Sequence, residues 1–109
     1  MPKETLGEFE ILVLLAALRL GDEAYGLSIA EEITRTADRP TGRASVYVTL
    51  RRLEKKGLIS TRREAASAAP SGKPRRFVRV RPEAVEMVQQ ARSALQRMWS
   101  GLEDVLEDA

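Results

Sequence analysis

The stretch Thr41–Ile59 brings an aromatic side chain and several cations to one side of an expected helix. Its apolar residues Val46, Leu50 and Leu53 recur at i, i+4 and i+7, the spacing of a buried stripe. At about 100° per residue, the opposite face collects side chains that include no acid: Ser45, Tyr47, Val48, Arg51, Arg52 and Lys55. A helix that packs by one side and shows cations and a tyrosine on the other suits a DNA groove.

Charges are segregated along the chain. Residues 1–40 hold four cations and eight acids, residues 41–82 twelve and two, and residues 83–109 two and six. The net charge of +2 therefore conceals a middle segment of net +10. Phosphate binding needs cations concentrated where the duplex lies, whereas mixed solvating charge would be spread more evenly. This favours the groove interpretation over a merely solvated face on which Glu54 pairs locally.

Cysteine and histidine are both absent from the 109 residues. Their absence excludes a disulfide framework and a thiolate metal site, and it disfavours a zinc or copper sensor. Enzymes that pair a nucleophile with a histidine base are excluded as well, and the carboxylates lie mainly in the outer segments without a convergent pattern. We therefore expect no enzyme, no metal and no cofactor.

The N-terminal third predicts a mostly buried helix from about Thr5 to Leu20, ending at Gly21. It is apolar on most sides, so a second chain or a C-terminal helix folding back is expected to cover it. Its continuous apolar run, Ile11–Leu18, has eight residues, too few to span a bilayer. The expected location is cytoplasmic, and the length fits one domain.

A second helix is expected over residues 25–36, with Glu31 and Glu32 facing water. Its packing face comprises Leu27, Ile29, Ala30 and Ile33. Thr41 is the expected N-cap of the basic helix that follows. The two helices together predict a helix-turn-helix.

Two short β-prone segments follow, Leu58–Arg63 and Arg75–Arg81, separated by an Ala-, Ser-, Pro- and Gly-rich stretch. They predict a hairpin with Val78 and Val80 on one face and Phe77 on the other. Three helices and this hairpin predict a mainly α fold with a small β-hairpin, a winged helix-turn-helix. The hairpin tip carries cations that could follow a phosphate backbone or enter a minor groove: Lys73, Arg75 and Arg76.

A last helix is expected to begin at Pro82, after the weak N-cap Arg81, and to continue for about 25 residues, or about 37 Å. Its apolar residues alternate by three and four, so it needs a partner beyond the winged-helix body. That partner is expected to be the last or first helix of a second subunit, through Leu95, Met98, Trp99, Leu102, Val105 and Leu106. Residues 1–81 would form a DNA-binding domain and residues 82–109 a dimerisation helix. The two-fold dimer would present two basic helices to a palindromic site.

Three stretches resemble segments of one family of regulators. SVYVTLRRLEKKGLIS resembles the recognition-helix segment of PadR-family transcriptional regulators, in which a Leu-Tyr-Pro-Thr-Leu type motif leads into Arg-Leu-Glu and Lys-Gly-Leu. LGEFEILVLLAALRLGDEAYGLSIAEEI is similar to the family's opening helices, and GKPRRFVRVRPEA to its second wing strand and the start of its last helix. The resemblance implies a dimeric winged-helix transcription factor, usually a repressor, of the small branch with a single C-terminal helix.

By position, Tyr47 and Thr49 match the motif's Tyr and Thr, Arg51 and Arg52 match its basic pair, and residues 73–76 match its wing. The chain departs from the family pattern at three positions: Val46 replaces a common Leu, Val48 a common Pro, and Arg81 a Thr that usually caps the last helix. The departure at the cap is expected to soften the start of that helix.

Some members of the family release DNA when a flat aromatic compound enters a space between subunits. Trp99, on the expected seam, could stack on such a ligand. The favoured alternative is a core or interface tryptophan without a ligand, because one aromatic residue on an apolar stripe is ordinary packing.

Together these observations predict a homodimeric, sequence-specific DNA-binding repressor. Ser45, Tyr47 and Arg51 are expected at base edges or nearby phosphates, and the other cations mainly at phosphates. The expected DNA-binding set is Arg43, Ser45, Tyr47, Thr49, Arg51, Arg52, Lys55, Lys73, Arg75 and Arg76. The alternative is a winged-helix protein-interaction module that binds no nucleic acid, and a small enzyme is the least favoured.

Overall fold

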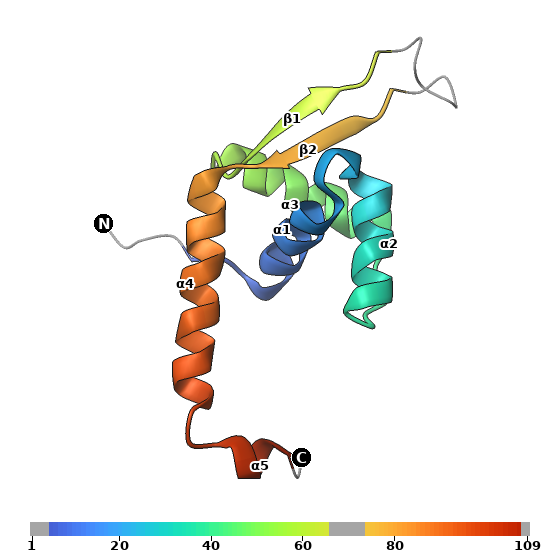
Figure 1. The fold of residues 1–109 in the computed structure, drawn as a ribbon. Coiled ribbons are helices and arrows are strands. Elements are labelled where there is room, and N and C mark those ends of the chain that lie inside the picture. The colour runs from blue at the N-terminus through green and yellow to red at the C-terminus, as the bar shows by residue number, and fades with distance from the viewer. Residues whose placement is uncertain (1–4, 66–73, 108–109) are drawn as a thin grey trace.

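The structure, a computed structural model, describes residues 5–65 and 74–107 (Figure 1). Three helices gather beneath a two-stranded hairpin, and a fourth runs from the base of the hairpin past the others. This is the winged helix-turn-helix with a C-terminal helix that the sequence predicts. The elements in chain order are α1 (Glu8–Leu20), the 3-10 helix η1 (Gly21–Glu23), α2 (Gly26–Thr36), α3 (Arg43–Lys55), β1 (Ile59–Arg63), β2 (Arg76–Val80), α4 (Pro82–Trp99) and α5 (Glu103–Glu107).

The core lies where α1, α2, α3 and the hairpin meet. Its largest fully buried side chains are Leu14, Ile29, Leu53, Val13 and Val46. α1 is less enclosed than its composition suggests, because Leu15 and Leu18 remain exposed on one side of the helix. No helix in the described part of the chain is long and apolar enough to cross a membrane.

α1 begins at Glu8, later than the expected Thr5. Gly7 is its N-cap, and the Glu10 carboxylate accepts the Gly7 N–H at 2.8 Å, which satisfies one of the free donors of the first turn. The helix ends before Gly21, as predicted. The φ of 58° at this glycine lies in the left-handed region that favours residues without a Cβ.

α3 begins at Arg43 with Gly42 as its N-cap, so the prediction of Thr41 as the cap is wrong. The Thr41 hydroxyl donates to the Arg39 carbonyl at 2.8 Å, and the Thr41 N–H donates to Thr34 Oγ1 at 3.0 Å. Thr41 therefore fastens the connecting loop to α2 instead of closing the first turn of α3.

Glu32 was expected to face water, and this prediction is wrong because the residue is only 5% exposed. Its carboxylate accepts hydrogen bonds from Thr36 Oγ1 at 2.6 Å and from Arg19 Nε at 2.9 Å, and it pairs with Arg35. These hydrogen bonds, with that of Thr36 the largest effect, hold the pKa of Glu32 below its ordinary value. The carboxylate thereby joins the C-terminal ends of α1 and α2.

β1 and β2 pair antiparallel, with Ile59 opposite Val80. Successive side chains of β2 point to opposite faces of the strand, yet Phe77 and Val78 are both buried. The Tyr25 ring meets Phe77 edge-on, with 5.5 Å between centroids, and the Val78 N–H donates to the Ala24 carbonyl at 2.8 Å. Residues 24–25 thus pair with β2 as a short third segment of the sheet and attach the hairpin to the start of α2.

The predicted continuous C-terminal helix is broken. α4 ends at Trp99 after 18 residues, and α5 begins only at Glu103. Gly101 turns the chain at a φ of 90°, and its N–H donates to the Glu103 carboxylate at 3.0 Å. α4 alone is therefore about 27 Å long rather than about 37 Å. α5 runs across the end of α4 (Figure 1).

Candidate nucleic-acid interface

The two faces of α3 differ in the way that the sequence predicts. Val46, Leu50 and Leu53 are buried against the core. On the opposite side Tyr47 is 45% exposed and Val48 is 51% exposed. The polar and basic members of this surface, which we call the α3 face, are exposed as well: Arg43, Ser45, Arg51, Arg52 and Lys55.

The cations of the α3 face carry unneutralised charge. Within residues 5–65 and 74–107, no carboxylate forms an ion pair with any of them. The ion pairs of this part of the chain engage other cations: Arg19, Arg35, Arg39, Lys56, Arg75 and Arg81. The positive charge of α3 is thus available to an anionic partner such as a phosphate backbone.

Thr49 does not share this surface. It is 4% exposed and lies on the inner side of α3, one helical step from the buried Leu50. The sequence pattern grouped it with the DNA-binding residues only through the family motif. Its position in the fold makes it a packing residue.

A hollow of about 190 Å³ separates α3 from the hairpin. Arg51 stands on the α3 wall and Arg76 on the β2 wall, so a phosphate between the two elements could meet a cation from each. Glu54, also on the α3 wall, accepts a hydrogen bond from the Thr61 hydroxyl of β1 at 2.9 Å. This bond holds the acid towards the hairpin and ties the recognition helix to it.

Arg75 is engaged inside the protein, although the sequence placed it among the DNA-binding residues. Its guanidinium donates from one terminal nitrogen to Glu64 Oε2 at 2.6 Å and from Nε to Glu64 Oε1 at 3.1 Å. The same group lies 5.2 Å from the centroid of the Tyr25 ring and 5.1 Å from that of Phe77. Hydrogen bonding to Arg75 is the largest effect that holds the pKa of Glu64 below its ordinary value. The arrangement joins the two wing strands at their tip-side end and attaches them to Tyr25.

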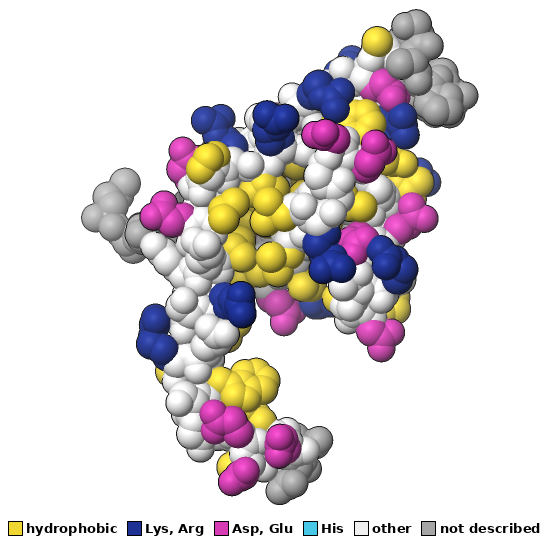
Figure 2. All heavy atoms as spheres, viewed as in Figure 1, with side chains coloured by type: hydrophobic (Ala, Val, Ile, Leu, Met, Phe, Trp, Pro, Cys, Tyr) yellow, Lys and Arg dark blue, Asp and Glu magenta, His cyan; other side chains and the backbone are white. Residues whose placement is uncertain are grey.

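The rest of the described wing supplies exposed cations. Figure 2 shows Lys and Arg side chains spread over the hairpin. In the described residues no hydrogen bond or ion pair engages the side chain of Arg76, which is exposed. Lys73, the third predicted wing cation, lies outside the described residues. Exposed strand cations that the sequence analysis left out of the site are Arg62, Arg63 and Arg79, and their inclusion in the basic middle segment was the signal for them.

A buried ion pair connects the end of α3 to the start of α1. Lys56 Nζ lies 2.9 Å from Glu10 Oε2, and Glu10 is almost fully buried. Burial alone would raise the pKa of Glu10, but the Gly7 N–H and Lys56 outweigh it, so the pKa lies below its ordinary value. No pattern in the sequence indicates this pair, because its members are far apart in the chain.

The predicted dimer seam on α4 and α5 is exposed in the single chain. Met98 is 76% exposed and Trp99 is 55% exposed, and the other predicted seam residues are exposed as well: Leu95, Leu102, Val105 and Leu106. In Figure 2, hydrophobic side chains gather between α4 and the neighbouring helices and again where α4 meets α5. Such a surface is larger than scattered apolar exposure and is typical of an interface.

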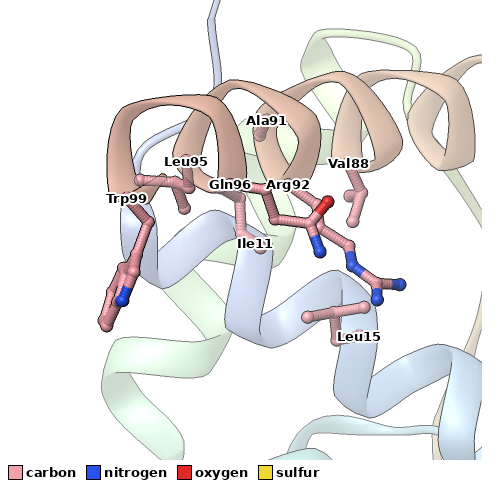
Figure 3. A pocket seen from close by; sticks show the side chains of 8 residues that line it. All are labelled: Ile11, Leu15, Val88, Ala91, Arg92, Leu95, Gln96 and Trp99. Carbon is pink, nitrogen blue, oxygen red and sulfur yellow. The ribbon is translucent and has the colours of Figure 1, made fainter. Parts of the chain in front are cut away.

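A cavity of about 300 Å³ opens between α1 and α4. Figure 3 shows Ile11 and Leu15 of α1 below α4, with Leu15 at the end near Val88 and Trp99 at the opposite end. The lining is mostly apolar, and Arg92 and Gln96 lie along its edge. The groove can take an apolar helix face or a small apolar ligand.

Comparison with known proteins agrees with this arrangement. A regulator of the PadR family from Eggerthella lenta has a TM-score of 0.68 and 25% identity, covering 94% of this chain and 88% of its own. One from Clostridium difficile has a TM-score of 0.73 and 20% identity, with coverages of 92% and 99%. No curated protein matches the chain. A sequence model described as the transcriptional regulator PadR-like family matches residues 14–82, well over half of the chain, and the protein therefore belongs to the PadR-like family of transcriptional regulators.

Proposed function

We propose that this regulator is a cytoplasmic homodimeric repressor that binds a palindromic DNA operator. The observation that carries the proposal is the α3 face, which shows cations and a tyrosine to solvent while Val46, Leu50 and Leu53 on the opposite side of the helix are buried. Those cations form no ion pair in the part of the chain that the structure describes. A free, acid-poor helix face on a helix-turn-helix suits the major groove.

Roles within the interface follow from position. Ser45, Tyr47 and Arg51 read base edges or nearby phosphates, and Arg43, Arg52 and Lys55 bind mainly phosphates. On the wing, Arg76 adds a phosphate contact, and Lys73 adds another at the tip. Thr49 acts by packing, and Arg75 acts by holding the two wing strands together at their tip-side end.

Dimerisation is proposed through residues 82–109, with residues 1–81 as the DNA-binding domain. The support is the exposed apolar surface on α4 and α5 and the uncovered side of α1 at Leu15 and Leu18. A second copy laid along α4 would remove these side chains from water. A two-fold pair would also place two copies of α3 on one side of a duplex.

A further part of the proposal concerns release from DNA by a small aromatic effector. Trp99 lines the α1–α4 cavity, which at about 300 Å³ is at the small end for a ligand site. We favour Trp99 as an interface tryptophan, with an aromatic effector as the alternative. Quenching of Trp99 fluorescence by a flat aromatic compound, together with loss of DNA binding, would establish the effector.

The experiment is fluorescence anisotropy against a duplex from upstream of the protein's own coding region and a scrambled duplex, at several salt concentrations. Tighter binding to the native duplex, with both affinities falling steeply as salt rises, supports a specific regulator of its own gene. Equal, salt-sensitive binding to both contradicts specific recognition at that site. No binding to either at low salt contradicts the proposal and favours the protein-interaction module.

A further inference from the structure

The ring of Tyr47 lies directly against Gly26, the first residue of α2. A Cβ placed on Gly26 would stand 2.6 Å from Cζ of Tyr47, 2.9 Å from its hydroxyl oxygen, and closer still to Cε1. No real side chain tolerates such distances, so any residue larger than glycine forces the ring to move. Gly26 is buried, whereas Tyr47 keeps 45% of its surface exposed.

The closeness has a direct consequence for the α3 face. A tyrosine side chain has few rotamers on a helix, and the Gly26 backbone forms a wall on one side of this ring. The Tyr47 ring therefore packs against α2, and this packing fixes the position of its hydroxyl group on the α3 face. The residue that limits the position of Tyr47 is therefore on a different helix from Tyr47 itself.

The neighbouring residue, Tyr25, makes the corresponding contact with the wing. Its ring packs edge-on against Phe77 and beside the Arg75 guanidinium, and its backbone bridges to Phe77. Two consecutive residues at the start of α2 thus touch the recognition helix on one side and the hairpin on the other. The recognition helix and the hairpin, the two elements proposed to face DNA, are therefore both positioned by the same short segment.

We propose that Gly26 is a positioning residue for operator recognition. Its backbone sets the position of the Tyr47 side chain on the α3 face, and the neighbouring Tyr25 connects the same segment to the wing. The inference rests on the proposed DNA-binding function. It assigns no contact with DNA to Gly26 itself. The glycine acts through Tyr47, so its effect on recognition must disappear when the tyrosine ring is removed.

The test is a double-mutant cycle on operator recognition. A duplex enriched from a random pool by the wild-type protein is compared with its scrambled version for wild type, Gly26→Ala, Tyr47→Ala and the double variant. Gly26→Ala should weaken binding to the selected duplex by about tenfold or more, the order of one misplaced base contact, and change binding to the scrambled duplex by less than about twofold. In the Tyr47→Ala background the same substitution should have an effect of less than about twofold.

Controls separate positioning from general packing. Gly7→Ala makes the same change where, among the described residues, the new Cβ meets only Glu10 Oε1 at 3.7 Å, an ordinary contact, and it should leave recognition unchanged. In the free wild-type protein, NMR should show a strong NOE between the Tyr47 ring protons and the Gly26 Hα protons, and its absence would overturn the inference. An equal loss on Gly26→Ala with and without the Tyr47 ring would also overturn it. A wild-type protein that enriches no duplex would refute the proposed function itself, which distinguishes the two failures.

Discussion

Arg75 and Glu64 form a two-point ion pair at the tip-side end of the two wing strands, with N–O distances of 2.6 and 3.1 Å. The next residue, Arg76, is exposed on β2 and faces the hollow beside α3. Adjacent arginines of the same strand therefore have different tasks. Arg75 holds the hairpin to the start of α2, whereas Arg76 remains accessible to a binding partner. Sequence alone treats the two as equivalent wing cations.

Substitution of each arginine by alanine should separate these tasks. Arg76→Ala should leave the melting temperature nearly unchanged and reduce the slope of log affinity against log salt by about 0.9 per subunit, because one phosphate contact is lost. Arg75→Ala should lower the melting temperature, because it leaves Glu64 without its partner and uncovers two aromatic rings. Thermal unfolding and salt-titrated anisotropy measure the two effects. An unchanged salt slope for Arg76→Ala would remove it from the phosphate contacts.

Arg51 should contribute sequence-specific affinity. It is exposed on α3 and lies on the wall of the hollow, where it would meet both base edges and phosphates of a bound duplex. Arg51→Ala should weaken binding to the operator by about 1–3 kcal/mol and leave dimerisation intact. Arg97→Ala, an exposed cation on α4, is the matched control and should have little effect on DNA binding. An unchanged operator affinity would exclude Arg51 from the recognition surface.

How much of this arrangement the sequence predicts depends on whether the controlling contact is local. The stripe of Val46, Leu50 and Leu53 repeats within one helix, so its period alone predicts the buried face and hence the exposed one. Glu32 is different, because it is buried by helix ends that meet only in the folded chain. The Glu10–Lys56 pair has the same origin, since its members are 46 residues apart, one in the first turn of α1 and the other just after α3.

The break after α4 shows a second limit. The apolar spacing of three and four continues through Ser100 and Gly101, and a single glycine inside a helix costs only about 1 kcal/mol. Periodicity therefore favoured one long helix, while the positive φ of Gly101 turns the chain. For Thr41 the signal was ambiguous in a similar way, because the adjacent Gly42 is also an acceptable N-cap.

The Glu10–Lys56 pair should matter for stability more than an exposed cation does. Lys56→Met leaves the buried Glu10 carboxylate without its main partner and should lower the free energy of unfolding by about 1–3 kcal/mol. Lys55→Met removes an exposed neighbouring cation and should change it by less than about 0.5 kcal/mol. Urea unfolding at neutral pH measures both. Adding Glu10→Gln to Lys56→Met should recover part of the loss, and equal effects of the two lysine substitutions would contradict the assignment.

Stability should fall in acid for a reason visible in the structure. In the folded protein the pKa values of Glu10 and Glu32 lie below the ordinary 4.5, so the unfolded chain binds protons first as pH decreases. The stabilisation is therefore complete above pH 4.5 and is lost as the pH falls through the folded-state values. No histidine is present to titrate between about pH 5 and 8. The urea midpoint should be level from about pH 7 to 5 and drop below that.

Matched glutamines test the origin of that drop. Glu10→Gln and Glu32→Gln should each make the midpoint less dependent on pH in the acid range, since the substituted group no longer titrates. Glu31→Gln, at an exposed position beside Glu32, serves as the control and should not change the pH dependence of the urea midpoint. A midpoint that stays constant down to about pH 3 in the wild-type protein would show that the buried carboxylates contribute no pH-dependent stability.

The dimer seam should be sensitive to charge on one side of α4 only. Met98 is 76% exposed in the single chain, and Leu102 lies where α4 turns into α5. In a dimer formed through this surface, Met98→Asp or Leu102→Asp would bury an unpaired carboxylate and should raise the dimer dissociation constant by about a hundredfold or more. Gln90→Asp places the same charge at an exposed polar position of α4 and should leave the dimer intact.

Sedimentation velocity over a range of concentrations measures this difference directly. A monomeric Met98→Asp protein should also lose most of its affinity for a palindromic duplex, because each half-site is then bound independently rather than at the high local concentration of a dimer. Its affinity for a single half-site should stay near that of one wild-type subunit, since Met98 lies near the end of α4 and the α3 face consists only of α3 residues. Stable dimers of both aspartate variants would place the subunit interface elsewhere and leave the apolar surface of α4 and α5 to another partner.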